Sequence, residues 1–147
     1  MKIAIASDHG GYEYKQQLIP FLEDMGHTVL DMGCNGPASV DYPDFALPCA
    51  QAVAAGEAER GVVICGTGIG ASICANKVAG IRCALCTDPL MARLTREHND
   101  ANVLALGGRI IGIELAKEIL RVFLASEFSG GRHKNRIDKI ARFEQAR

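Results

Sequence analysis

The feature that most constrains the fold is a regular alternation of short apolar runs with longer segments of helical periodicity. The apolar runs read as strands that are buried on both faces, and such strands are typical of parallel sheets. Right-handed crossover helices join parallel strands and cover both faces of the sheet. The pattern therefore predicts an α/β fold: a three-layer α/β/α sandwich with a Rossmann-like five-stranded parallel sheet, plus a C-terminal helix.

The expected elements follow from the apolar runs, the helical spacing and the Gly, Pro and Asp residues between them. The expected strands are Lys2–Ala6, Thr28–Asp31, Val62–Ile64, Arg82–Cys86 and Val103–Leu106. The expected helices are Tyr12–Met25, Asp41–Ala55, a segment after Gly70, Pro89–His98, Ile113–Ala125 and Arg132–Gln145. Pro48 favours a later start for the second helix, because proline disturbs a helix interior. The last helix should turn Ile137, Ile140 and Ala141 inward, with Phe143 at the edge of that stripe.

Composition and charge favour one cytoplasmic domain over residues 1–147. The chain is 48% apolar and 22% charged, which is ordinary for a globular protein. A formal net charge of -1 provides no field that would attract nucleic acid or acidic lipid. No apolar run approaches the roughly 20 residues that span a bilayer, and the N-terminus does not read as a signal peptide. We therefore expect neither a nucleic-acid partner nor a membrane partner.

Six cysteines are present, and in a cytoplasmic chain they are expected to be free thiols. Cys83 and Cys86 have the C-x-x-C spacing of some zinc and redox sites. They lie in a strand-like run without turn residues, and no second pair exists. The pattern favours small buried side chains at these positions over a metal or redox site.

The clearest site signal is the stretch Gly61–Lys77, with the sequence GVVICGTGIGASICANK. A buried strand ends at Cys65, and a Gly-rich turn leads directly into a helix. Glycines allow a ligand to approach backbone N–H groups, and a helix N-terminus favours negative charge. The same environment favours the thiolate form of a cysteine, which could act as a nucleophile or as a base. The alternative is a Gly-rich structural turn with a buried apolar cysteine.

The same glycines also fit a dinucleotide-binding fingerprint, G-x-G-x-x-A, with Asp88 near the distance expected for a ribose-binding acid. Three observations weaken this interpretation. The motif follows the third strand, the chain leaves little room for a substrate domain, and Cys65 has no role in that scheme. A small phosphorylated ligand fits the scale of the chain better.

Other polar residues are expected at strand and helix ends. Asp8 and His9 follow the first strand and Tyr42 follows the second, so they should lie near Cys65. His98 ends a helix, where it could also be a simple cap. Further cations are Arg109 after the fifth strand and Arg132 and Arg136, which lie four residues apart at the start of the last helix.

These motifs occur together and in order along the chain: Asp8–Gly11, Asp41–Pro43, Ile64–Gly70, Ala75–Lys77, His98–Asp100 and Gly130–His133. Together they resemble ribose-5-phosphate isomerase of the B type. That family also includes allose-6-phosphate isomerase and the subunits of galactose-6-phosphate isomerase. The resemblance implies a metal-independent aldose–ketose isomerase of the pentose phosphate pathway, with no cofactor and no metal ligand.

The resemblance also implies roles in catalysis. Cys65 would be the base that moves a proton between C1 and C2 of the sugar through a cis-enediolate, and Thr67 would position it. A related branch uses a glutamate just past the third glycine, but Ala71 occupies that position here. The backbone N–H groups of Gly66, Thr67, Gly68, Ile69 and Gly70 would hold the developing oxyanion. His98 would open the furanose ring.

The remaining implied residues bind substrate: Asp8, His9, Tyr42, Asn99, Arg109, Arg132 and Arg136. The resemblance implies an obligate homodimer with shared sites, with a tetramer as a further option. His98, Asn99 and Arg109 would then come from the partner chain. Two alternatives stay open: a hexose-phosphate isomerase, such as one for allose 6-phosphate, and a non-catalytic module that binds a nucleotide or sugar phosphate.

Overall fold

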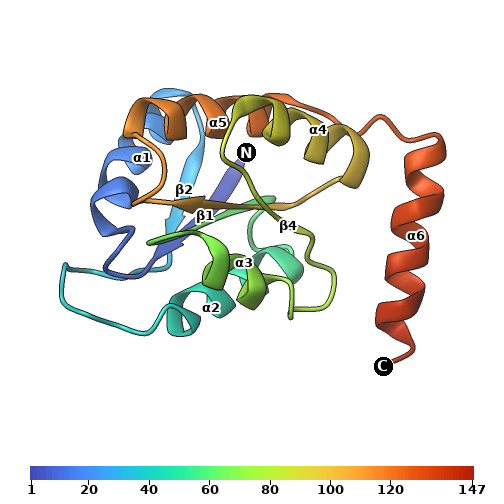
Figure 1. The fold of residues 1–147 in the computed structure, drawn as a ribbon, viewed down its shortest axis with the longest axis horizontal. Coiled ribbons are helices and arrows are strands. Elements are labelled where there is room, and N and C mark those ends of the chain that lie inside the picture. Colours follow the sequence, from blue (N-terminus) through green and yellow to red (C-terminus); the bar gives the residue numbers. More distant parts are fainter.

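The computed structural model describes residues 1–147, which form five strands and six helices that alternate along most of the chain (Figure 1). The strands are β1 (Lys2–Ser7), β2 (Thr28–Asp31), β3 (Arg60–Cys65), β4 (Cys83–Leu85) and β5 (Val103–Gly107). The helices are α1 (Tyr12–Asp24), α2 (Pro43–Ala54), α3 (Ile69–Ala75), α4 (Pro89–Asn99), α5 (Ile113–Ala125) and α6 (Arg132–Gln145). None of these helices is long and apolar enough to cross a membrane.

All five strands are parallel and are arranged in the order β2-β1-β3-β5-β4. The chain places β2 on one side of β1 and β3 on the other side, and β5 and β4 lie beyond β3. The switch point therefore lies between β1 and β3, where Ser7 pairs with Ile64. In open α/β sheets, ligands bind beyond the carboxyl ends of the strands at such a point. A ligand site is therefore expected among the residues that follow β1 and β3.

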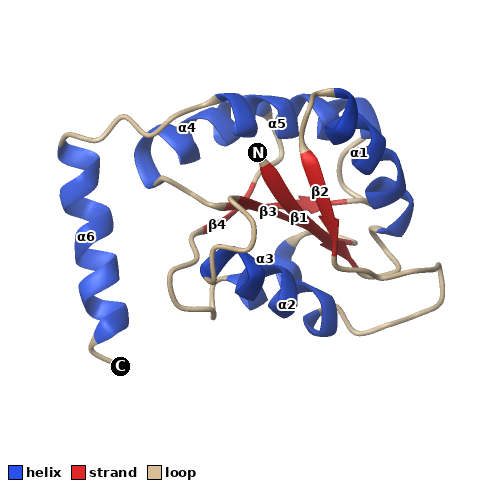
Figure 2. Cartoon of the chain, turned by 180° about the vertical axis from the view of Figure 1, so that it is seen from behind, coloured by secondary structure: helices blue, strands red, loops and turns tan.

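The two faces of the sheet bury different side chains, because successive residues of a strand point to opposite faces. On one face, Ile3, Ile5 and other large side chains pack with α1, α4 and α5. On the other face, Ala4, Ala6 and further small residues pack with α2 and α3. Figure 2 shows these helices on the two sides of the sheet. The expected α/β/α sandwich is confirmed.

The later start expected for the second helix is wrong, because α2 begins at Pro43 and continues through Pro48. A proline in a helix interior costs about 3 kcal/mol. Buried Ala46, Cys49 and Ala50 pack α2 against the sheet. Such tertiary packing supplies most of the stability of protein helices and outweighs the lost hydrogen bond.

Helix α6 stands away from the sandwich, and it does not bury the expected stripe (Figure 1). Ile137 is buried, but Ile140 is 56% exposed and Phe143 is 68% exposed. The periodicity correctly indicates that these residues share a side of the helix. The expectation that they all face this chain's own core is wrong.

Candidate active site

Three loops meet at the carboxyl ends of β1, β3 and β5. The Asp8 N–H donates to the Ile64 carbonyl at 3.2 Å, and the Gly108 N–H donates to the Cys65 carbonyl at 2.9 Å. A Cβ atom on Gly108 would lie 2.7 Å from the carbonyl oxygen of Gly10, which is too close for any other residue. Glycine is therefore required at position 108 by the close approach of two backbones.

Cys65 ends β3 with its side chain almost wholly buried, at 4% exposure. The Gly68 N–H donates a hydrogen bond to Cys65 Sγ at 3.1 Å. Gly68 has φ of 79° and precedes α3, a backbone conformation that glycine adopts without strain. The Thr67 hydroxyl accepts from the Ile69 N–H at 3.2 Å. The turn thus directs an N–H group at the sulfur atom that would carry the charge of a thiolate.

Three other cysteines have thiols that burial keeps protonated. Burial raises the pKa of Cys49 to about 12, and it does the same for Cys86. Burial also raises the pKa of Cys83 far above its usual range. These side chains stay protonated at neutral pH and act as small apolar groups.

Side chains from the neighbouring loops surround this turn. Asp8 is buried, and its carboxylate accepts from the Gly10 N–H at 2.8 Å. His9 Nδ1 accepts from the Val40 N–H at 3.2 Å, which fixes the ring against the loop after β2. The Tyr42 ring lies directly over Gly70, where a Cβ atom would be 2.7 Å from Tyr42 Cζ.

Arg109 also belongs to this group within the same chain. Its N–H donates to the Gly66 carbonyl at 2.9 Å, and a Cβ atom on Gly66 would lie 3.4 Å from Arg109 Nη1. His9 and Arg109 line one open cavity of about 260 Å³. The expectation that Arg109 reaches the Cys65 site only from a partner chain is therefore corrected, because the tight turn after β5 places it beside its own Gly66.

A second group of the expected residues gathers where α4 ends and α6 begins. The rings of His98 and His133 are stacked, with centroids 4.3 Å apart and an interplanar angle of 11°. Arg132 and Arg136 lie beside them. The pKa of His133 is lowered by loss of hydration and by the nearby charges of His98, Arg132 and Arg136. The two guanidinium groups beside the stacked rings form a positively charged cluster that suits an anion.

The two groups of residues lie at opposite ends of the strands. Cys65 and Gly107 end their strands at the carboxyl edge. Helix α4 runs back from the end of β4 to the start of β5, so His98 lies at the amino edge. Figure 1 shows α6 at one end of the molecule and the loop after β2 at the other. One chain therefore does not bring its own His98, Asn99, Arg132 and Arg136 to its own Cys65.

Comparison with known proteins identifies the family of this chain. The family model described as Ribose/Galactose Isomerase matches residues 3–140. The chain belongs to this family. The resemblance that the sequence motifs indicate is thereby confirmed.

Individual relatives cover nearly the whole chain. Ribose-5-phosphate isomerase B of Escherichia coli is 47% identical over 99% of this chain and 98% of its own length. D-erythrulose-4-phosphate isomerase of Pectobacterium atrosepticum is 42% identical over 98% of this chain and 95% of its own length. The solved structure of Clostridium thermocellum ribose-5-phosphate isomerase B is 56% identical and superposes with a TM-score of 0.98, covering 99% of both chains.

Within this family framework, two further residues change their interpretation. The Asp88 carboxylate caps α4 by accepting from the Met91 N–H at 2.8 Å. This explains Asp88 without a ribose ligand and removes the support it gave to the dinucleotide fingerprint. The sequence motifs include His133 but assign it no role, although it directly follows Arg132 and its ring stacks on His98. Its stacking on His98 depends on how α6 meets α4, which no local pattern encodes.

Proposed function

We propose that this isomerase interconverts ribose 5-phosphate and ribulose 5-phosphate, as one isomerase domain over residues 1–147. The observation that carries the proposal is the hydrogen bond from the Gly68 N–H to Cys65 Sγ, at the switch point of the sheet. A base that removes a proton next to a carbonyl works best as a positioned, partly ionised group. Cys65 is this base, and it passes the proton between C1 and C2 through a cis-enediolate.

The turn from Gly66 to Gly70 supports this step. Its backbone N–H groups hold the enediolate oxygens, as preorganised donors do in other enzymes. The Thr67 hydroxyl lies exposed at the start of the turn and positions the reacting groups. Asp8, His9 and Tyr42 bind the sugar from the neighbouring loops, and Arg109 adds a positive charge beside Gly66.

The remaining parts of the site come from a second copy of the chain. We propose that His98 of this copy opens the furanose ring, Asn99 binds the sugar, and Arg132 and Arg136 bind the phosphate. The separation of the two groups within one chain supports this homodimer. A dianionic phosphate held by two guanidinium groups supplies binding energy away from the reacting carbons.

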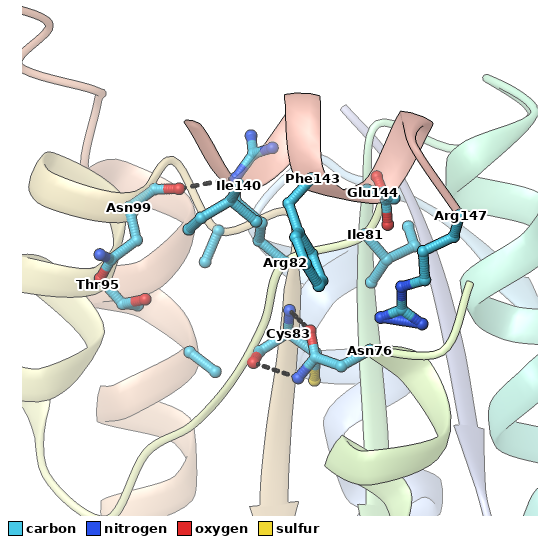
Figure 3. Close-up of a pocket in the computed structure, with 12 residues that line it drawn as sticks. Asn76, Ile81, Arg82, Cys83, Thr95, Asn99, Ile140, Phe143, Glu144 and Arg147 are labelled. Atoms are coloured by element: carbon cyan, nitrogen blue, oxygen red, sulfur yellow. Dashed lines mark hydrogen bonds between the residues drawn. The ribbon is translucent and has the colours of Figure 1, made fainter. Parts of the chain in front are cut away.

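A groove between α6 and the sandwich provides room for side chains of the second copy. It encloses about 490 Å³, and Figure 3 shows Ile140 and Phe143 pointing from α6 towards Arg82 and Cys83. Elsewhere on the chain, Ile69 and Ile73 of α3 expose apolar side chains next to the Cys65 turn. If the α6 groove of one copy covered α3 of the other, the two groups of site residues would come together. Sedimentation would distinguish the proposed dimer from a tetramer formed by two dimers.

The test of the function is a direct assay with purified protein, ribose 5-phosphate and a chelator. We expect turnover without added metal, and loss of turnover in Cys65→Ala while ribose 5-phosphate still binds. Cys74→Ala, in the adjacent helix, is the matched control and should stay active. An inactive wild-type protein, or an active Cys65→Ala variant, would contradict the proposal. Parallel assays with allose 6-phosphate decide the preferred chain length of the sugar.

We also propose a cytoplasmic location. All six cysteines are free thiols, which suits a reducing compartment.

A further inference from the structure

Arg96 is a buried cation on α4 for which the proposed reaction has no step. Its side chain is 3% exposed. Nη1 donates to Asp100 Oδ1 at 2.8 Å and to the Ala101 carbonyl at 2.6 Å, and Nε donates to the Ser126 carbonyl at 3.3 Å. Ser126 caps α5 and begins the connection to α6. One rigid guanidinium group therefore joins the end of α4 to the segment that leads into α6.

The backbone at the end of α4 is held in an unusual conformation. Asp100 has φ of 45° and ψ of 43°, the left-handed region that residues other than glycine seldom adopt. Arg82 donates to the carbonyl oxygens of Asn99 at 2.7 Å and Asp100 at 3.0 Å. Together with Arg96, it satisfies carbonyl groups that a helix end leaves without partners. The direction of His98 and Asn99 depends on this fixed end.

The connection to α6 is tied to the same place. The Ser129 N–H donates to the Glu97 carbonyl at 3.0 Å, and α6 begins three residues later at Arg132. His98 then stacks on His133 of the first turn of α6. The contacts of Arg96 thus join the end of α4, which carries His98, to the segment that leads into α6, which carries Arg132 and Arg136.

We propose that Arg96 is a positioning residue that holds His98 and the Arg132–Arg136 pair in one fixed arrangement, so that both enter the partner's site together. This inference rests on the proposed function for the roles of those groups. The planar guanidinium presents several donors in a rigid fork, whereas lysine has one flexible ammonium group. Lysine can keep the contact with Asp100 but cannot reach the carbonyls of Ala101 and Ser126 in the same geometry.

The test compares wild type with Arg96→Gln, Arg96→Lys and the matched variant Arg93→Gln. Arg93 lies on the same helix but is exposed and pairs only with Glu97, at 3.5 Å. The first readout is the NMR chemical shifts of the His98 and His133 rings, with circular dichroism as the check of folding. We expect both Arg96 variants to lose the mutual ring-current shifts, and Arg93→Gln to keep them. A folded Arg96 variant with unchanged ring shifts would overturn the proposal.

The second readout is the kinetics of ribose 5-phosphate isomerisation. Misplaced catalytic groups cost about 100-fold in rate, and we expect a fall of this size in kcat/KM, with KM raised as well as kcat lowered. Arg93→Gln should stay within about two-fold of wild type, as expected for an exposed ion pair. A merely structural role would lower kcat with the folded fraction and leave KM unchanged, which would also overturn the proposal.

The two readouts separate failure of this inference from failure of the proposed function. An inactive wild-type protein would refute the function, while the ring shifts would still decide whether Arg96 holds the junction. If Arg96→Gln does not fold, Arg96→Lys, which keeps the charge, decides both readouts.

Discussion

An ion pair with one buried and one exposed partner, at the end of β2, gives the sharpest prediction about stability. Lys15 of α1 is only 1% exposed, and its Nζ donates to both Asp31 oxygens, at 2.8 and 2.9 Å. The Asp31 side chain is 40% exposed, so water reaches it. Removing Asp31 would leave a buried ammonium group without a hydrogen-bond acceptor, facing only the Tyr12 ring at 5.7 Å. Removing the charge of Lys15 would leave only a carboxylate that water can solvate.

The expected costs of the two substitutions are therefore unequal. Asp31→Ala should lower the free energy of unfolding by about 3–5 kcal/mol, the cost of breaking a buried pair from one side. Lys15→Met keeps most of the buried chain length and should cost about 1 kcal/mol or less. Unfolding entropy of about 2.1 cal/mol/K per residue gives roughly 0.3 kcal/mol/K for 147 residues. Asp31→Ala should then lower Tm by about 10–16 °C.

Calorimetry and urea unfolding at one fixed protein concentration measure both costs, since oligomerisation makes Tm depend on concentration. The Asp31 carboxylate also accepts from the Gly33 N–H at 2.9 Å, so its removal should loosen the loop that carries Tyr42. Equal effects of the two substitutions, or a loss below about 1 kcal/mol in Asp31→Ala, would refute the argument from unequal burial.

Three further predictions concern the site. Gly70→Ala should displace the Tyr42 ring, which would lie 2.7 Å from the new Cβ atom, and should raise KM for ribose 5-phosphate about 10-fold. Tm should change little because Tyr42 is 41% exposed, and unchanged kinetics would count against Tyr42 as a substrate contact. The pKa of His133 is lowered by lost hydration and by neighbouring cations, so bound sulfate should raise this pKa by opposing those cations. An NMR titration in which sulfate leaves the pKa of His133 unchanged would argue against an anion site. His98→Asn should slow ribose 5-phosphate turnover but spare erythrose 4-phosphate, which cannot close a furanose ring; equal losses in kcat/KM would remove the ring-opening role.

Much of the fold could be predicted because strand burial and helix ends are recorded locally. The apolar runs and the intervening helical periodicity define a parallel sheet, and Cys65 with its glycines defines a turn at a strand end. The strand order is not local information. The sequence does not indicate that β5 lies between β3 and β4, since that choice depends on how the crossovers pack.

Candidate residues for the site can be named from the sequence, but their arrangement cannot. The family resemblance implies that Arg109 comes from the partner, yet a backbone hydrogen bond to Gly66 holds it beside the Cys65 turn of its own chain. The periodicity of α6 identifies which residues share a side, but not what covers Phe143. The proposed role of Arg96 and the stacking of His133 depend on contacts between α4 and the segment around α6, which join residues about 30 positions apart.

The central claim is that each site combines Cys65 of one chain with Arg132 and Arg136 of another. The most direct test mixes two inactive variants, Cys65→Ala and the double variant Arg132→Ala/Arg136→Ala, by unfolding and refolding them together at equal amounts. Random pairing makes half of the dimers mixed, and each mixed dimer has one intact site of two, so activity should recover to about a quarter of refolded wild type. A mixture no more active than its two parents would show that the site does not cross between chains.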